Sequence, residues 1–251
     1  MEIKHFNNVL STDEGNIGLI VADNICSTFV YPEFLLRHYS QLKCINDDCI
    51  RDILDVGCGA GPFGVYFGLH GKRVDGIDIN PIAVECCRLN IEKYNLRNNF
   101  RVMLAGIQAF TSGKRYDLII CNPPLGHDSY MRKEVSFDYY RIKEKVSDGI
   151  IDAETEDYLT NCWRDERGKD MIDYIFERSE HLLRQNGKIL IVCGDDFIDG
   201  TDFICSKASS YPHLSICHCQ KYKEHLHLED IDEVYDCDKT YNIVALEYIS
   251  D

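Results

Sequence analysis

Closely spaced glycines near residue 60 could let a ligand lie directly against the backbone. Gly59, Gly61 and Gly64 satisfy the pattern G-x-G-x-x-G directly after an apolar run. Such a turn leads into a helix N-terminus whose backbone N–H groups are exposed. Asp78 closes the next apolar run about 20 residues later, where a carboxylate accepts hydrogen bonds from a ribose. The spacing therefore predicts a nucleoside-containing ligand, and NAD is one reading of it.

Other features favour S-adenosylmethionine over a dinucleotide. Asp55 and Gly57 add an acidic residue upstream of the glycines, where a carboxylate could hold a cationic amino-acid portion. The motif Asn122-Pro123-Pro124 follows a later apolar run, and a dinucleotide site does not require it. The chain also leaves little room for a separate substrate domain. We therefore expect S-adenosylmethionine as the cofactor, with an NAD oxidoreductase as the rival.

Asn122-Pro123-Pro124 could present hydrogen-bond acceptors without competing donors. Asn122 supplies a side-chain carbonyl, Pro123 supplies a backbone carbonyl, and neither proline has an N–H. Residues that precede proline are also held extended. An amide or aromatic amine nitrogen is a poor nucleophile because its lone pair is delocalised, and acceptors around its N–H groups can free that lone pair. We assign the three residues as the methyl-transfer site; the alternative is a strand that ends in a proline turn.

Short apolar runs alternate with helical patterns from residue 51 onward, which predicts a mainly parallel α/β sheet. Asn80 and Pro81 signal the start of one helix. A second helix follows Asp170 and is expected to stop at Gly187. The expected strands are 52–56, 73–77, 100–104, 116–121, 188–193, 214–221 and 241–248.

Two stretches depart from this alternation. Residues 1–50 form an N-terminal extension or substrate-approach segment, and residues 51–251 form the catalytic domain. Within that domain, residues 126–168 form a polar insertion that contains the only tryptophan, Trp163. Long loops in compact domains are usually functional, so we expect a lid or recognition element, with a partly disordered segment as the alternative.

The charge balance argues against a nucleic-acid partner. The chain has 27 basic and 42 acidic residues and a net charge of −15, whereas binding to a phosphate backbone relies on Lys and Arg. The weak basic clusters lie at 97–101, 132–133 and 141–145. A small-molecule or protein acceptor is therefore expected. With no long apolar run and no signal-peptide pattern at the N-terminus, we expect a cytoplasmic protein without a membrane partner.

Thirteen cysteines are present, and no C-x-x-C pair occurs among them. In a reducing compartment they pack as small apolar side chains. A metal site around Cys217-His218-Cys219 and His225-Leu226-His227 is the alternative, because alternate residues on a strand share a face. We expect no metal.

Taken together, the run from Asp55 to Gly61, Asp78, Asn122-Pro123-Pro124 and the run from Gly168 to Val192 resemble the class I S-adenosylmethionine-dependent methyltransferases. The most similar members are the amide and amino N-methyltransferases typified by release-factor glutamine methyltransferase. The segment from Val30 to Glu33 resembles the proline-containing approach segment of that family. The resemblance implies a Rossmann-like, doubly wound sheet of seven mostly parallel strands with an antiparallel last strand. It also implies N-methylation.

The resemblance also implies roles for individual residues. Asp55 and the backbone of 57–61 would face the methionine portion of the cofactor, and Asp78 would bind the ribose. The family commonly has an acidic residue after the third strand, where this chain offers only Gln108 for the adenine. The expected cofactor-binding residues are Asp55, Gly57, Cys58, Gly59, Gly61, Asp78, Ile79, Gln108 and Asn122.

A second departure concerns the acceptor. Leu125 stands where relatives carry an aromatic residue that stacks on the planar target group. Tyr31, Phe63, Tyr130 or Trp163 could supply the missing aromatic face, and His127 could act as a proton acceptor or be an ordinary loop residue.

Several functions stay open at this point. The leading one is N-methylation of a protein side-chain amide or of a small-molecule amine or amide. The alternative enzyme is an N-methyltransferase for a base of rRNA or tRNA. A cofactor-binding scaffold without activity would have no use for the Asn-Pro-Pro motif. Fifty N-terminal residues are too few to reproduce the recognition domain of the release-factor enzymes.

Overall fold

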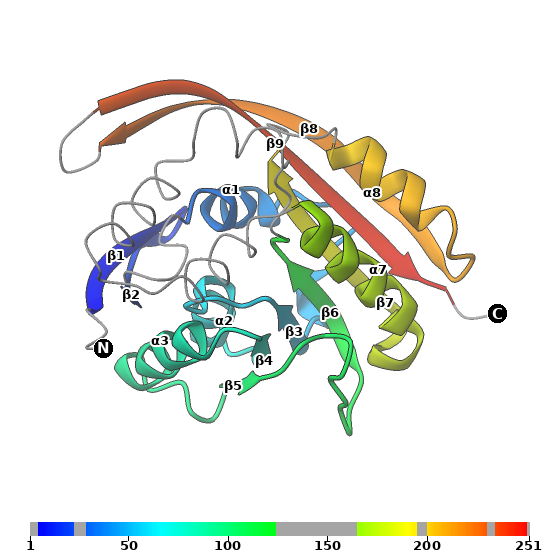
Figure 1. Ribbon diagram of the computed structural model, residues 1–251, viewed down its shortest axis with the longest axis horizontal. Helices are drawn as coiled ribbons and strands as arrows, with labels where there is room; N and C mark the ends of the chain where they lie inside the picture. Colours follow the sequence, from blue (N-terminus) through cyan, green and yellow to red (C-terminus); the bar gives the residue numbers. More distant parts are fainter. Residues whose placement is uncertain (1–4, 23–28, 124–164, 195–199, 230–233, 250–251) are drawn as a thin grey trace.

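A single seven-stranded sheet with helices on both faces forms the centre of the computed structural model (Figure 1). The structure describes residues 5–22, 29–123, 165–194, 200–229 and 234–249. The sheet order is β5-β4-β3-β6-β7-β9-β8. The strands are β3 (Asp52–Val56), β4 (Arg73–Asp78), β5 (Phe100–Leu104), β6 (Tyr116–Cys121), β7 (Leu183–Gly194), β8 (Leu214–Glu229) and β9 (Val234–Tyr248).

The strand directions confirm the predicted Rossmann-like topology. β5, β4, β3, β6 and β7 pair in parallel, whereas β9 runs antiparallel to both β7 and β8. The carboxyl ends of the parallel strands therefore meet at one edge of the sheet, which is where α/β proteins bind their ligands.

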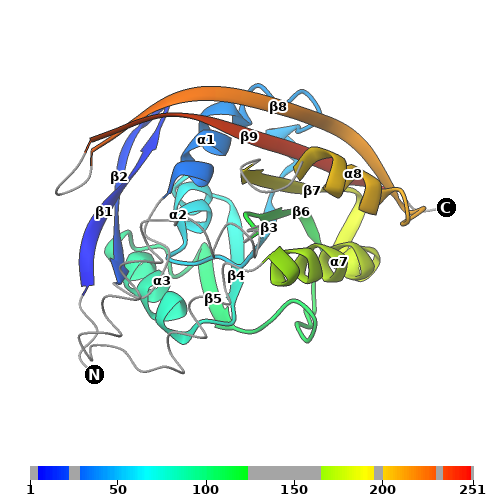
Figure 2. The ribbon, with the colours of Figure 1, turned by 45° about the horizontal axis from the view of Figure 1, so that its top comes forward.

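The two faces of the sheet carry separate apolar cores. One face is covered by α1 (Val30–Tyr39), α2 (Pro62–Leu69) and α3 (Pro81–Lys93), and Phe34, Phe67 and Phe100 are buried there. The other is covered by α7 (Asp165–Leu182) and α8 (Gly200–Ala208), which bury Ile175, Phe176 and Ile204. Figure 2 shows α7 and α8 on the opposite side of the sheet from α1 and α2. A short 3-10 helix (Asp47–Cys49) precedes β3.

Local signals placed most elements correctly. Asn80 caps α3 as predicted, since its Oδ1 accepts a hydrogen bond from the Ile82 N–H at 2.9 Å. The expected stop of the second helix at Gly187 is wrong. α7 ends at Leu182, and Leu183 already belongs to β7. The left-handed turn falls at Asn186, whose φ is 61°, inside a strand that shifts register against β6.

The last two strands are longer than the sequence predicts. β7 pairs with β9 only between Lys188 and Gly194, but β8 and β9 continue to pair with each other as far as Glu229 and Val234. Each strand of a hairpin satisfies the backbone of the other, so the pairing does not need the rest of the sheet. The two strands arch over α1 (Figure 2).

The N-terminal extension contains a β-hairpin of β1 (His5–Thr12) and β2 (Gly15–Ala22). The fully buried side chain of Asn90 on α3 ties this hairpin to the sheet domain. Its amide accepts from the Ile20 N–H at 2.7 Å and donates to the Ile20 carbonyl at 2.8 Å, as a neighbouring strand would. It also donates to the Ala60 carbonyl at 2.9 Å, so the hairpin is connected to the glycine loop.

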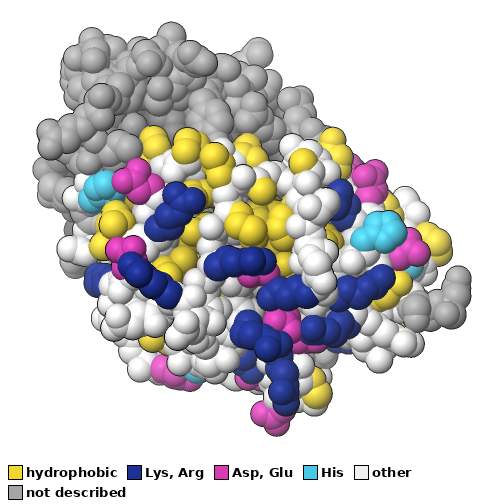
Figure 3. Space-filling model, turned by 90° about the horizontal axis from the view of Figure 1, so that it is seen from below, with side chains coloured by type: hydrophobic (Ala, Val, Ile, Leu, Met, Phe, Trp, Pro, Cys, Tyr) yellow, Lys and Arg dark blue, Asp and Glu magenta, His cyan; other side chains and the backbone are white. Residues whose placement is uncertain are grey.

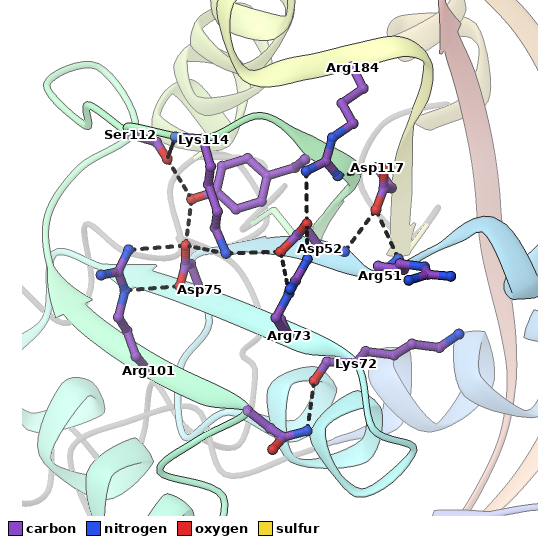
Figure 4. Close-up of polar contacts among 12 residues, drawn as sticks. Arg51, Asp52, Lys72, Arg73, Asp75, Arg101, Ser112, Lys114, Asp117 and Arg184 are labelled. Carbon is purple, nitrogen blue, oxygen red and sulfur yellow. Dashed lines mark hydrogen bonds and ion pairs between the residues drawn. The ribbon is translucent and has the colours of Figure 1, made fainter.

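A network of ion pairs closes the opposite, amino-terminal edge of the sheet (Figure 4). Asp52 accepts hydrogen bonds from Arg73, Arg184 and Lys114, although its own side chain is only 2% exposed. Asp75 pairs with Arg101 in the same way. Figure 3 shows Lys and Arg side chains gathered around acidic ones on this face. Four cationic side chains of the network bind aspartates of the protein itself, and we assign them a structural role: Arg73, Arg101, Lys114 and Arg184.

This network predicts a loss of stability in acid. Burial raises the pKa of Asp52, but the hydrogen bonds from Arg73, Arg184 and Lys114 more than offset it and hold the pKa well below its ordinary value. An unfolded Asp titrates near pH 4, so the stabilisation is present above about pH 4 and is lost as the pH falls further. We expect Asp52→Asn to be less stable at pH 7 by roughly 1–3 kcal/mol. Unfolding curves between pH 3 and 7 should converge for the two proteins in acid; a constant difference would contradict the assignment.

None of the helices in the described part of the chain combines the length and apolar character needed to cross a bilayer.

Candidate functional site

The glycine loop between β3 and α2 takes a conformation that only glycine adopts easily. Gly57, Gly59 and Gly61 have φ values of 70°, 54° and 85°. At Gly64, in the first turn of α2, a Cβ atom would come within 2.0 Å of the Phe100 ring. The first three glycines thus shape a bare backbone surface, and the fourth lets the helix pack directly on β5.

Asp78, at the end of β4, holds this loop in place. Its Oδ2 accepts from the Gly59 N–H at 2.8 Å, and its Oδ1 accepts from the Asn80 N–H at 2.8 Å. Burial raises the pKa of Asp78, and backbone N–H groups oppose that shift. A carboxylate accepts about four hydrogen bonds, so acceptor capacity remains for a further donor such as a ribose hydroxyl. The side chain is half-buried and also organises the loop, a structural role that the sequence did not reveal.

Asp55, the last residue but one of β3, is a buried acid with an unsatisfied oxygen. The residue is 1% exposed, and its Oδ2 has no hydrogen-bond partner among the described residues. Burial and the nearby charge of Asp78 raise the pKa of Asp55 to about 8, and a backbone hydrogen bond from Gly64 opposes this. A buried, unsatisfied carboxylate is costly unless something pairs with it. The arrangement is therefore suited to a ligand that brings a cation or N–H donors.

The motif that the sequence assigns to methyl transfer lies beside this loop. Cys121, the last residue of β6, pairs in register with Val56, the last residue of β3, so Asn122 and Gly57 directly follow two adjacent strands. Asn122 is half-buried and Pro123 is buried, whereas Pro124 lies outside the described residues. The structure thus brings Asp55, the glycines and Asn122 to one edge of the sheet.

The ends of β4 and β5 offer an apolar rim on the other side of the loop. Ile79 is 47% exposed directly after Asp78, and Leu104 is 57% exposed at the end of β5. Gln108 is exposed, and its side chain folds back over Gly106, where an added Cβ would lie 2.4 Å from Oε1. Arg178 of α7 donates to the Gln108 carbonyl at 2.9 Å and so fixes this turn.

One contributor, Met171 on α7, was not foreseen. Its Sδ lies 3.4 Å from the Cys121 Sγ, and its Cε would lie 3.4 Å from a Cβ at Gly57. Met171 therefore packs against both the glycine loop and the end of β6. In sequence it belongs to the apolar stripe of a helix, and no local signal separates it from core residues.

Several residues that the sequence singled out cannot be placed. Leu125, His127, Tyr130 and Trp163 lie outside the described residues, as does most of the predicted insertion 126–168. Phe63 is buried in the core beneath α2.

The expectation that Cys217 and Cys219 share a face of β8 is wrong. A register shift between Ile216 and His218 turns them to opposite sides, so that Cys217 is hydrogen-bonded to Cys44 and the Cys219 Sγ lies 2.9 Å from that of Cys205 on α8. No group of three or more metal-binding side chains converges within the described ranges.

The charges of the site favour one of its two candidate ligands over the other. A dinucleotide would place its pyrophosphate against the glycine loop, beside Asp55 and Asp78, which already repel each other. The first helical residue, Pro62, also lacks the N–H that would bind an anion. S-adenosylmethionine carries an ammonium group and a sulfonium, which the two carboxylates attract. The residues present therefore fit S-adenosylmethionine and disfavour NAD.

Comparison with known proteins agrees with this. Residues 35–139 match the model of the methyltransferase small domain family. The chain is 27% identical over 162 residues to release factor glutamine methyltransferase of Clostridium botulinum, a match that covers 62% of this chain and 51% of the relative. It is 38% identical over 72 residues to a tRNA (uracil(54)-C(5))-methyltransferase of Pyrococcus abyssi, covering 29% of this chain and 17% of the relative. The chain thus spans about half or less of these relatives.

Solved structures show the same fold. The 16S rRNA N2 G1207 methyltransferase of T. thermophilus, solved with AdoMet and guanosine, superimposes with a TM-score of 0.56 at 13% identity over 99% of this chain and 51% of the other. The N-methyltransferase NodS of Bradyrhizobium japonicum gives 0.50 at 15% identity over 89% of this chain and all of its own. The expected resemblance to class I methyltransferases is confirmed.

Proposed function

We propose that this chain, which contains a class I methyltransferase domain, transfers a methyl group from S-adenosylmethionine to an amide or amine nitrogen of a small molecule or protein side chain. The observation that carries the proposal is the unsatisfied, buried Asp55 oxygen beside a glycine loop that adjoins Asn122. S-adenosylmethionine, when bound, supplies a methyl group on a positively charged sulfur.

Residues on both sides of the loop would hold the cofactor. Asp55 would accept hydrogen bonds from its ammonium group, and the backbone of 57–61 would lie against the methionine portion. The remaining acceptor capacity of Asp78 would serve a ribose hydroxyl. Ile79 offers an apolar surface to the adenine, and the Gln108 amide can both donate to and accept from its edge.

Asn122, Pro123 and Pro124 would orient the acceptor. The Asn122 side-chain carbonyl and the Pro123 carbonyl are hydrogen-bond acceptors for the N–H groups of the target nitrogen. With both hydrogens drawn to these acceptors, the nitrogen lone pair points away from them, toward the cofactor side of the site. The proton can leave after transfer, so this arrangement does not require a strong general base.

A base of tRNA or rRNA is the second candidate acceptor. It is supported by the similarity to the P. abyssi and T. thermophilus proteins, which act on tRNA and 16S rRNA. The excess of 42 acidic over 27 basic residues counts against it.

Two measurements test the proposal. Thermal-shift titrations should show stabilisation by S-adenosylhomocysteine and none by NAD, because a ligand at 100 times its Kd adds about 2.7 kcal/mol to the unfolding free energy. Incubation with tritium-labelled S-adenosylmethionine and cell lysate, followed by separation into RNA, protein and small molecules, should then label one acceptor class. Stabilisation by NAD alone, or label in no fraction, would contradict the proposed function; label confined to RNA would favour the second acceptor.

A further inference from the structure

Three residues at the carboxyl edge of the sheet lie on the same face. Side chains alternate along a strand, and the neighbours of Asp55 on β3, Leu54 and Val56, belong to the core beneath α7 and α8. Asp55 therefore faces the side of α1, α2 and α3. By the same alternation, Asn122 lies on this face, because Ile120 packs into the core on that side. Gly194 does also, because it follows Val192 of that core by two residues.

The strand register arranges these residues as successive steps. Asp55 pairs with Ile120, and Ile120 pairs with Leu190. Asn122 thus lies two residues further along than Asp55, and Gly194 a further two. Two residues of strand span about 6.6 Å and neighbouring strands lie about 4.8 Å apart, so each step measures roughly 8 Å. Asp55, Asn122 and Gly194 therefore form a diagonal row across β3, β6 and β7, with Gly194 furthest from Asp55.

Tyr31 covers Gly194, the last residue of this row. A Cβ atom added at Gly194 would lie 2.2 Å from the Tyr31 Oη and 2.8 Å from its Cζ, so the ring rests directly on the bare backbone of this glycine. Tyr31 is half-buried at the start of α1. Because Gly194 has no side chain, the Tyr31 ring can contact the backbone of β7 directly.

The helix that carries Tyr31 is firmly held. The ring of Phe34 stacks on that of Tyr241 at 4.1 Å between centroids, and Tyr31 meets Tyr241 edge-on at 5.5 Å. Arg37 forms a bidentate ion pair with Glu224 of β8, at 2.7 and 2.9 Å. β8 and β9 thus fix α1, and with it Tyr31, over the end of β7.

We propose that Tyr31 forms the outer wall of the acceptor pocket and positions a planar acceptor group against Asn122; this inference rests on the proposed function. The chain has leucine, not an aromatic residue, directly after the two prolines. Of the other aromatic residues that could compensate, Phe63 is buried in the core. Tyr31 provides the flat face from another element, opposite the cofactor side of Asn122. It is a specificity-determining residue and takes no part in proton transfer.

The test uses the full chain and four variants. Tyr31→Ala removes the ring, Tyr31→Phe keeps its face, and Gly194→Ala displaces it. Tyr94→Ala is the matched control, since Tyr94 is a half-buried tyrosine directly after α3 whose hydroxyl donates to the Gly18 carbonyl of the N-terminal hairpin. Each protein is assayed for label transfer into the RNA, protein and small-molecule fractions of a lysate at increasing amounts of each fraction. S-adenosylhomocysteine binding is measured in parallel by thermal shift.

We expect Tyr31→Ala and Gly194→Ala to raise the half-saturating amount of the labelled fraction about five-fold or more. Tyr31→Phe and Tyr94→Ala should stay within about two-fold of the wild type, and S-adenosylhomocysteine should stabilise all five proteins equally. An unchanged acceptor requirement in Tyr31→Ala, or an equal loss of S-adenosylhomocysteine binding, would overturn this inference alone. Absence of label with the wild type would overturn the proposed function, and this inference with it.

Discussion

Asp55→Asn should stabilise the ligand-free protein and at the same time weaken S-adenosylhomocysteine binding. The buried Asp55 Oδ2 has no partner among the described residues, and its carboxyl group has a pKa of about 8. The folded state therefore keeps a proton that the unfolded state releases near pH 4, so stability falls as the pH rises from 4 to 8. Asparagine has nearly the same shape and no charge, which removes this cost.

The affinity should change in the opposite direction. A hydrogen bond to a charged group contributes roughly 1.5–3 kcal/mol, so losing the carboxylate should weaken S-adenosylhomocysteine binding by about 10- to 100-fold. In the ligand-free state at pH 8, we expect the variant to melt at least about 2 °C above the wild type, and this difference should shrink toward pH 4. Calorimetric titration and thermal unfolding across this range measure both effects.

Asp75→Asn is the matched control for this prediction. Asp75 is an equally buried acid on the adjacent strand, but it is fully engaged by Arg101 and by the Tyr116 hydroxyl at 2.7 Å. Its variant should lose stability and keep its affinity for S-adenosylhomocysteine. If Asp55→Asn is destabilised like Asp75→Asn at every pH, then the protein itself satisfies Asp55 and the cofactor has no need of it.

Asn122→Ala should abolish most of the methyl transfer while leaving the cofactor largely bound. Removing one preorganised hydrogen-bonding group from an active site typically lowers turnover 10²- to 10³-fold. Asn122 follows β6, and its backbone is restrained by the proline that follows it, so truncating the side chain should leave the strand in place. We therefore expect kcat to fall by that factor, whereas the Kd for S-adenosylhomocysteine should change by less than about five-fold.

Asn122→Asp separates the chemical role from the structural one. A carboxylate retains acceptor oxygens at the same position, so this variant should recover part of the turnover lost in alanine. Single-turnover transfer of tritium label, with the cofactor saturating, measures the chemical step alone. Equal turnover in wild type and Asn122→Ala would mean that the motif is only a proline turn at the end of a strand.

The two predictions together distinguish the halves of the site. Asp55 acts on the cofactor, and its buried, unsatisfied carboxyl group lowers the stability of the ligand-free protein while making it able to bind the cofactor. Asn122 acts mainly on the acceptor, and binding of the cofactor should depend on it only weakly. A single structural defect in the domain would affect both measurements in the same direction.

Much of the fold follows from local sequence patterns. β5 and β6 have the predicted bounds, and α3 begins at its predicted cap. The signals for these elements are apolar runs, Asn80 and Pro81, and each of them affects only the conformation of nearby residues. The end of α7 was misplaced because Gly187 is a permissive residue, and here Asn186 adopts the left-handed conformation instead. β8 and β9 were underestimated because their outer halves are held only by each other.

By itself, the sequence determined the order of the seven sheet strands along the chain, the glycine loop with its acid at residue 78, and the proline-restrained motif at 122–123. These features depend on backbone restrictions and spacing along the chain, which need no distant contact. Only the tertiary structure decided that the Asp55 oxygen is buried and unsatisfied, that Asp78 also anchors the loop, and that Tyr31 rests on Gly194. Burial, electrostatic coupling and ring contacts depend on residues far apart in sequence, and folding alone brings them together.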